Sequence, residues 1–283
     1  MSEIKIRIFH TGRVYVSSSL PFKDNVKNPK PFQLTILSCY GRRNRIWLPV
    51  SAYLIDHPKG KILVDTGWHR DISPNGEYNR RAQVKHMGVG HFLLNQGLLP
   101  KDESIVEQLS KLNIEPKNLD YVILTHLHTD HASGLSQLKD AKHILVSKKE
   151  FQDTKKYPVR YAKSMWDGIN FETFNFSQTD LGPVGRSFDL FNDGSIELIN
   201  IPGHTNGLTA VKVNHNGKFV LLFSDGGYAT KSWKEMIPPG TALDENQALK
   251  SLQWIRETSL DKNCVESLAN HDPDVIPHEI ILN

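Results

Sequence analysis

The stretch Thr125-His126-Leu127-His128-Thr129-Asp130-His131 places three imidazoles and a carboxylate within six positions, from His126 to His131. In extended chain, residues two apart point to the same side, so His126 and His128 can reach a common ion. Asp130 and His131 then turn toward a second ion. A polar loop with several surface histidines is the alternative, but imidazole and carboxylate at this spacing are ligands that zinc accepts. The stretch therefore predicts a metal site.

The chain just before these residues indicates where they lie. Tyr121–Leu124 is a short apolar run, which is typical of a buried strand. The preceding residues Asp102–Leu112 carry apolar side chains at the spacing of an amphipathic helix. The histidines are therefore expected at the C-terminal end of a strand.

Three more candidate ligands occupy the same kind of position, directly after or at the end of a predicted strand. They are His204 after Ile196–Ile201, Asp225 at the end of Lys218–Ser224, and His271 after Cys264–Leu268. Loops at strand ends commonly carry ligands in α/β proteins, although each of these histidines alone would also fit a surface or hydrogen-bonded role. With the first stretch they supply about the number of ligands that two zinc ions need when they share a water or hydroxide.

The remaining pattern predicts one domain over residues 1–283, with two packed sheets and helices outside them. The other expected strands are Ile4–His10 and Arg13–Ser17 around a Thr11-Gly12 turn, a hairpin of Val50–Asp56 and Lys61–Asp65, His143–Val146, and Leu208–Val213 paired with Lys218–Ser224. Asp244–Thr258 has a helical pattern. Residues 18–50 and 68–100 are expected to be loops or helices that cover a site.

Composition limits the classes of partner and the compartment. A formal net charge of +3 over 283 residues is too small to indicate nucleic acid. No apolar stretch approaches the roughly 18 residues of a membrane span, and the N-terminus alternates like a strand rather than a signal peptide. Cys39 and Cys264 have no CxxC partner, so we expect two buried thiols in a reducing cytoplasm, with a bridge between them left open. A homodimer is also left open.

The chain resembles the metallo-β-lactamase superfamily, whose HxHxDH signature matches His126, His128, Asp130 and His131. The resemblance runs from Asp65 to His271 and implies an αβ/βα four-layer sandwich of two mixed sheets with helices outside, the metal site lying at one edge between the sheets. It implies one zinc at His126, His128 and His204, a second zinc at Asp130, His131 and His271, and Asp225 as the bridge. The aspartate of Asp65-Thr66-Gly67 would orient a ligating histidine rather than bind metal.

The resemblance also narrows the branch of the superfamily. The nitrogen-rich ligand set favours zinc, because the iron-binding flavodiiron branch has a glutamate where this chain has His128. Class B β-lactamases commonly have a cysteine at the position of Asp225. The C-terminal helical domain of glyoxalase II does not fit between His271 and Asn283, and no inserted nuclease domain is recognisable.

Tyr228, three residues after Asp225, resembles a tyrosine of the N-acyl-homoserine lactonases, the quorum-quenching branch. The resemblance implies that a zinc-bridging hydroxide opens the lactone ring, with Tyr228 stabilising the oxyanion and Asp130 transferring a proton to the leaving alkoxide. A packed aromatic residue is the other interpretation of Tyr228. The alternatives for the protein are a thioesterase or phosphodiesterase on the same metal pair, and a non-catalytic metal-binding accessory protein.

Two basic segments and two further histidines have ordinary explanations. The basic segments Gly41–Arg45 and Lys148–Lys163 are interpreted as solvated faces. His86 and His91 are expected to be surface or core residues, or part of an access loop.

Overall fold

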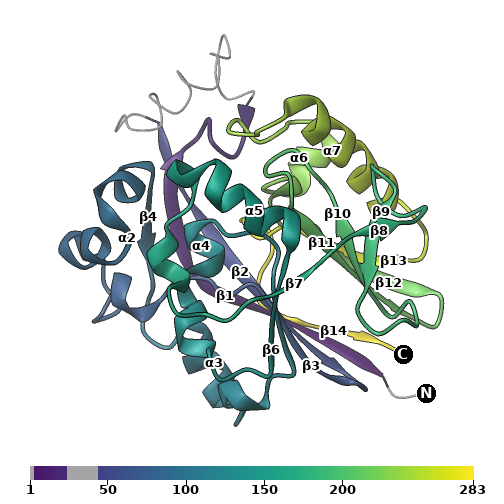
Figure 1. The fold of residues 1–283 in the computed structure, drawn as a ribbon, viewed down its shortest axis with the longest axis horizontal. Coiled ribbons are helices and arrows are strands. Elements are labelled where there is room, and N and C mark those ends of the chain that lie inside the picture. The colour runs from purple at the N-terminus through teal and green to yellow at the C-terminus, as the bar shows by residue number, and fades with distance from the viewer. Residues whose placement is uncertain (1–2, 24–43) are drawn as a thin grey trace.

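The computed structural model describes residues 3–23 and 44–283, and its strands form two sheets (Figure 1). The larger sheet has the order β14-β1-β2-β3-β5-β6-β7, with β4 paired to β1. Its strands are β1 (Ile4–Ser17), β2 (Arg45–His57), β3 (Gly60–Val64), β4 (Asn95–Leu98), β5 (Tyr121–Leu124), β6 (His143–Ser147), β7 (Glu172–Phe174) and β14 (Glu279–Leu282). Both parallel and antiparallel pairs occur, so the sheet is mixed.

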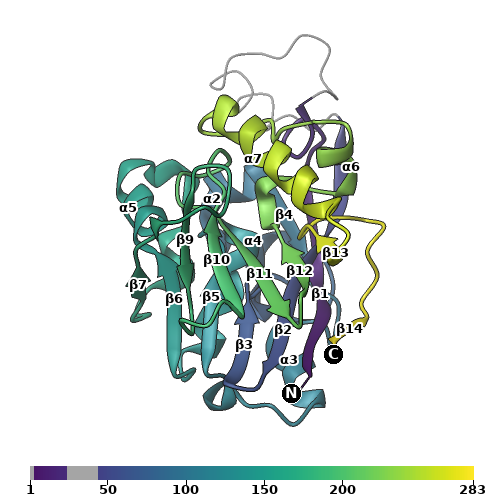
Figure 2. The same cartoon turned by 90° about the vertical axis from the view of Figure 1, so that its right-hand side faces the viewer.

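The smaller sheet has the order β13-β12-β11-β10-β9-β8 and is also mixed. Its strands are β8 (Ser177–Gln178), β9 (Arg186–Asp189), β10 (Ile196–Asn200), β11 (Thr209–His215), β12 (Lys218–Leu222) and β13 (Cys264–Leu268). The helices are α2 (Arg80–Leu94), α3 (Ile105–Lys111), α4 (Thr129–Ala132), α5 (Lys148–Lys156), α6 (Thr230–Lys234) and α7 (Glu245–Ser259). Figures 1 and 2 show α3 outside the larger sheet and α7 outside the smaller one.

Three apolar clusters separate the four layers. Ile6 and Ile55 of the larger sheet belong to one cluster with Leu198 and Val220 of the smaller sheet, so this cluster lies between the sheets. Leu54 alternates with Ile55 along β2 and belongs instead to the cluster that includes residues of α2 and α3. A third cluster joins the smaller sheet to α7. The predicted αβ/βα sandwich with helices outside is confirmed.

Most predicted elements are confirmed with shifted ends. The β2–β3 and β11–β12 hairpins form as expected, and the last predicted strand has the bounds of β13. The helix expected over Asp102–Leu112 begins later, because Ser104 caps it and forms a capping box with Glu107. Asp244 caps α7 in the same way, by accepting from the backbone N–H of Gln247.

The predicted turn at Thr11-Gly12 is wrong. Residues on both sides of it pair with β2 in one continuous strand, β1, and the register shifts between His10 and Arg13. Thr11 and Gly12 lie opposite Val50 alone, so β1 carries one extra residue there, and Gly12 takes a φ of 89° in this bulge. Glycine marks a bulge as readily as a turn, so the sequence pattern could not separate them.

The two segments that we expected to be loops or helices contain strands as well. Residues 45–50 begin β2, and residues 95–98 form β4 against β1 after α2. The rest of the first segment, residues 24–43, lies outside the described residues, and with it lie Cys39 and most of the Gly41–Arg45 segment. Cys264 is half-buried on β13, which is less than the burial we expected. No helix among the described residues has the length and apolar content to cross a membrane.

Candidate metal centre

All seven predicted ligands converge at one place, although they come from four separate segments of chain. The segment after β5 carries His126, His128, Asp130 and His131, and the last two of these lie in α4, which begins at Thr129. The others follow strands of the smaller sheet, His204 after β10, Asp225 after β12 and His271 after β13. Six of the seven are buried, and the seventh, His128, is partly buried.

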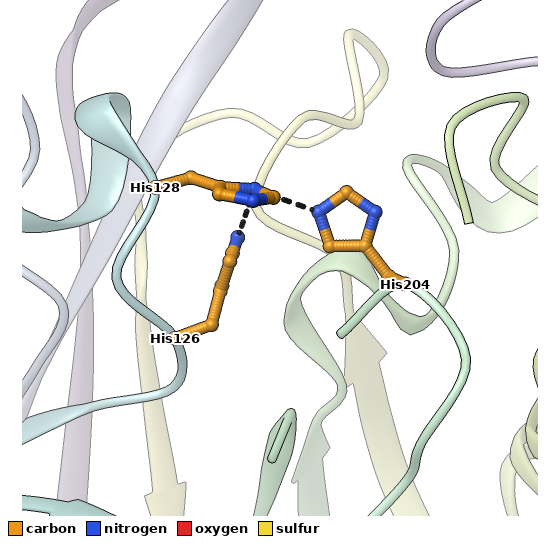
Figure 3. Close-up of side chains that lie close together, drawn as sticks. All are labelled: His126, His128 and His204. Carbon is orange, nitrogen blue, oxygen red and sulfur yellow. Dashed lines mark hydrogen bonds between the residues drawn. The ribbon is translucent and has the colours of Figure 1, made fainter. Parts of the chain in front are cut away.

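The first group consists of His126, His128 and His204, which point toward one another in Figure 3. Nδ1 of His128 lies 3.1 Å from Nε2 of His126 and 2.9 Å from Nε2 of His204. With Zn–N bonds of 2.0–2.1 Å, the ligand atoms of a tetrahedral site are about 3.3 Å apart. Two of the three separations within this group are therefore close to those of a zinc site.

The second group consists of Asp130, His131 and His271. Nε2 of His271 lies 3.4 Å from Oδ2 of Asp130. Asp225 stands between the two groups: its Oδ2 is 3.5 Å from Nε2 of His204, and its Oδ1 is 3.4 Å from Nε2 of His131 and 3.3 Å from Nε2 of His271. One oxygen therefore faces each group, as a bridging carboxylate requires.

Several buried atoms at the meeting point lack an ordinary partner. Nε2 of His131, Nε2 of His271 and Oδ1 of Asp225 have no hydrogen bond within the part of the chain that the structure describes. Buried polar atoms are rarely left unpaired, because their desolvation is costly. A pair of metal ions would satisfy all three, so the residues fit the dinuclear zinc centre that the sequence predicts.

The opposite ring nitrogens in the second group are held by other residues. Nδ1 of His131 lies 2.8 Å from Oδ2 of Asp65, and Nδ1 of His271 lies 2.8 Å from the carbonyl oxygen of Pro49. Each acceptor keeps the proton on Nδ1 and leaves Nε2 free to bind metal. The structure therefore places Asp65 where we expected it, beside a ligand and outside the ligand set. Asn270 also donates to Asp65 and fixes this carboxylate.

Burial keeps the imidazoles of the first group neutral. It lowers the pKa of His126 and His128 well below the usual value and that of His204 to about 3, and neighbouring histidines add to the effect. Only a neutral imidazole offers a lone pair to a metal. The three imidazoles of the first group are thus in their binding form at neutral pH.

A narrow pocket opens onto this centre. Polar residues on its wall include His128, Asp130, His204 and Tyr228. Apolar residues form much of the rest: Val14, Val16, Leu20, Leu94 and Val159. The Tyr228 ring stacks on His271 with centroids 5.0 Å apart, and burial followed by the charge of Asp225 raises the pKa of its phenol. The phenol therefore stays protonated and can donate a hydrogen bond.

Two residues of the site were missed, and both lie in the basic segment that we interpreted as a solvated face. Arg160 is partly buried and donates to the backbone carbonyls of His204 at 3.0 Å and Thr241 at 2.9 Å. Glu150 is fully buried, and burial raises its pKa to about 7. The pair Ser147 and Glu150 has the S-x-x-E spacing of a helix start, which could have placed α5 but not the direction of the glutamate. His91 lines the pocket, which agrees with an access role, whereas His86 packs against His69.

Comparison with known proteins agrees with this geometry. The chain is 28% identical over 270 residues to the N-acyl homoserine lactonase AttM of Agrobacterium fabrum, with 93% of this chain and 94% of the relative covered. It is 26% identical over 219 residues to an N-acyl homoserine lactonase of Bacillus cereus, with 76% and 78% covered.

Solved structures show the same fold. A variant of AiiA from B. thuringiensis with N-decanoyl-L-homoserine bound at its active site superposes with a TM-score of 0.73, at 22% identity and with 97% of this chain and 95% of that one covered. AidC, described as a dizinc quorum-quenching lactonase, superposes with a TM-score of 0.58 at 15% identity, with 96% of this chain and 88% of that one covered.

The family model of the metallo-beta-lactamase superfamily matches residues 45–257, which is more than half of the chain. That range runs from β2 to α7 and includes six of the seven converging side chains. The chain belongs to the metallo-beta-lactamase superfamily.

Proposed function

We propose that the protein is a dinuclear zinc hydrolase that opens the lactone ring of N-acyl homoserine lactones. The observation that carries the proposal is the pocket in which Tyr228 and Asp130 stand beside His128 and His204. A proton donor and a carboxylate thus lie next to the proposed metal centre, where an ester carbonyl would react. The curated lactonases, which match over nearly the whole chain, support the same activity.

In this proposal His126, His128 and His204 hold one ion, Asp130, His131 and His271 hold the other, and Asp225 is shared. Bound zinc would supply an activated water and polarise the lactone carbonyl. The pairing of oxygen and nitrogen donors favours zinc over harder ions. The ligands are pre-arranged by Asp65, Pro49 and their neighbours, so little reorganisation is needed on binding.

Tyr228 would donate its phenolic hydrogen to the carbonyl oxygen as negative charge develops on it. Asp130 would take up the proton released when water attacks and return it to the alkoxide that leaves the ring. Burial of both residues excludes bulk water, which strengthens these interactions in the transition state.

The apolar wall of the pocket suits the acyl chain of such a substrate, because alkyl groups gain free energy when they leave water. The proposal also takes residues 1–283 as one hydrolase domain that works in the cytoplasm, as a monomer or a homodimer, without a nucleic-acid or membrane partner. The small net charge supports the absence of a nucleic-acid partner.

A substrate panel tests the proposal. We expect zinc-loaded protein to hydrolyse N-acyl homoserine lactones with a kcat/KM at least tenfold above that for phosphodiesters, because Tyr228 adds a donor suited to a carbonyl oxygen, at about 1.4 kcal/mol per tenfold. A thioester has the same carbonyl, so the lactone and a thioester with the same acyl chain are compared directly, and we expect the lactone to react faster. Chelation should abolish the activity, and zinc should restore it.

Faster turnover of a thioester or phosphodiester would replace the lactonase assignment by one of those activities. Tight zinc binding without turnover of any of the three classes would favour a non-catalytic metal-binding protein.

A further inference from the structure

Helix α5 packs one face against the loop that carries His204. Residues Ser147, Glu150 and Asp153 are three apart, so they lie on the same side of the helix start. Each bonds to one residue of the loop: Ser147 Oγ donates to the carbonyl of Gly207 at 2.9 Å, Glu150 Oε2 accepts from Thr205 Oγ1 at 2.6 Å, and Asp153 Oδ2 accepts from the backbone N–H of Asn206 at 3.2 Å. The helix thus holds residues 205–207, next to the ligand.

The helix and the loop are in direct backbone contact at Gly207. A Cβ added to Gly207 would lie 2.1 Å from the backbone nitrogen of Glu150, so the loop touches the helix backbone itself. Glycine is required for so close an approach. A small shift of Glu150 would therefore be transmitted to the loop.

Glu150 also reaches the other ligand segment. Its Oε1 accepts from the backbone N–H of Leu127 at 3.1 Å. Leu127 stands between His126 and His128, and Thr205 follows His204 directly. One buried carboxylate therefore joins the two segments that supply the first group of imidazoles.

The second group is held by different residues. Asp65 orients His131, and the carbonyl of Pro49 orients His271. Neither of these supports comes from α5. Loss of the Glu150 contacts should therefore change the geometry of the first group and leave the second in place.

We propose that Glu150 is a positioning residue, which sets the spacing between His126, His128 and His204 and thereby the zinc affinity of this half of the centre. The inference rests on the proposed zinc assignment but not on the identity of the substrate.

The test compares zinc binding in Glu150→Leu and Glu150→Gln, measured by competition with a chromophoric chelator. Leucine removes both acceptors, and we expect one of the two ions to bind roughly tenfold to a hundredfold more weakly, the range for losing a group that supports a ligand. Glutamine keeps an amide oxygen for Leu127, and its amide group can donate to the Thr205 hydroxyl, so it should restore most of the affinity.

Two comparisons test whether the loss of zinc affinity comes from the contacts of Glu150 with Leu127 and Thr205. In a His204→Ala background, where the first group is already broken, Glu150→Leu should cause little further loss, because coupled residues are not additive. Asp153→Leu removes a contact between α5 and the loop at Asn206 but leaves the contact of Glu150 with Leu127 in place. It should therefore weaken zinc binding less than Glu150→Leu does. Should Glu150→Leu not fold, Thr205→Val removes one of the two Glu150 contacts with little change of side-chain shape. It should weaken the binding of the same ion by a smaller factor.

The positioning role would be overturned if Glu150→Leu weakened the binding of both ions equally. It would also be overturned if Glu150→Gln or Asp153→Leu lost as much zinc affinity as Glu150→Leu. Unchanged affinity in Glu150→Leu would overturn it as well. Failure of the wild-type protein to bind two zinc ions would instead contradict the proposed function, so the two failures can be told apart.

Discussion

Asp225→Ala is expected to remove both metal ions and nearly all activity. The carboxylate places one oxygen near His204 and the other near His131 and His271, at 3.3–3.5 Å, so both groups lose a ligand at once. Its negative charge also offsets the repulsion between two divalent cations. We expect kcat/KM to fall by more than the roughly 10–100-fold typical of residues that only support a ligand.

The measurement is metal analysis alongside steady-state kinetics. Wild-type protein should contain about two zinc ions per chain, since seven ligands exceed what one tetrahedral site can use. A wild-type content of one ion, or iron as the main metal, would contradict the dinuclear zinc centre. If Asp225→Ala lost one ion and kept its activity, Asp225 would not be the bridge. Thermal unfolding of the metal-free proteins is the control for folding.

Tyr228→Phe should keep both zinc ions and the fold but slow turnover. Its phenol stays protonated, because burial and the charge of Asp225 raise its pKa, and so it can donate to the developing oxyanion. Loss of one pre-arranged donor lowers kcat by about tenfold to a thousandfold. Zinc would polarise the same oxygen, so we expect the lower part of this range.

With an acyl-homoserine lactone as substrate, kcat should fall more than KM rises, because the hydrogen bond strengthens in the transition state. Tyr161→Phe is a matched control: Tyr161 is buried and packs against His128 with ring centroids 5.4 Å apart, but it does not line the pocket. It should have a much smaller effect on kcat. Unchanged turnover in Tyr228→Phe would make Tyr228 a packing residue and would remove the residue-level support for a lactonase.

Much of the site follows from residues that are close together in the chain. The HxHxDH spacing and the position of each candidate after an apolar run are local features, and local chemistry also set the starts of α3 and α7 at Ser104 and Asp244. Apolar runs of strand length predicted the two sheets, because strands covered on both faces are apolar throughout. The sequence by itself therefore determined the fold class and the candidate ligands.

The tertiary structure alone decided how these residues are held. Glycine at position 12 suited a turn or a bulge equally, and the choice was made by pairing with β2. Likewise, Glu150 and Arg160 lie in a basic segment whose composition is that of a surface, yet Glu150 is buried and Arg160 is partly buried. Glu150 accepts from the backbone N–H of Leu127, and Arg160 donates to the backbone carbonyl of His204; such groups occur at nearly every position of any sequence. Contacts between distant backbone groups leave no pattern in the chain, so only the folded structure reveals them.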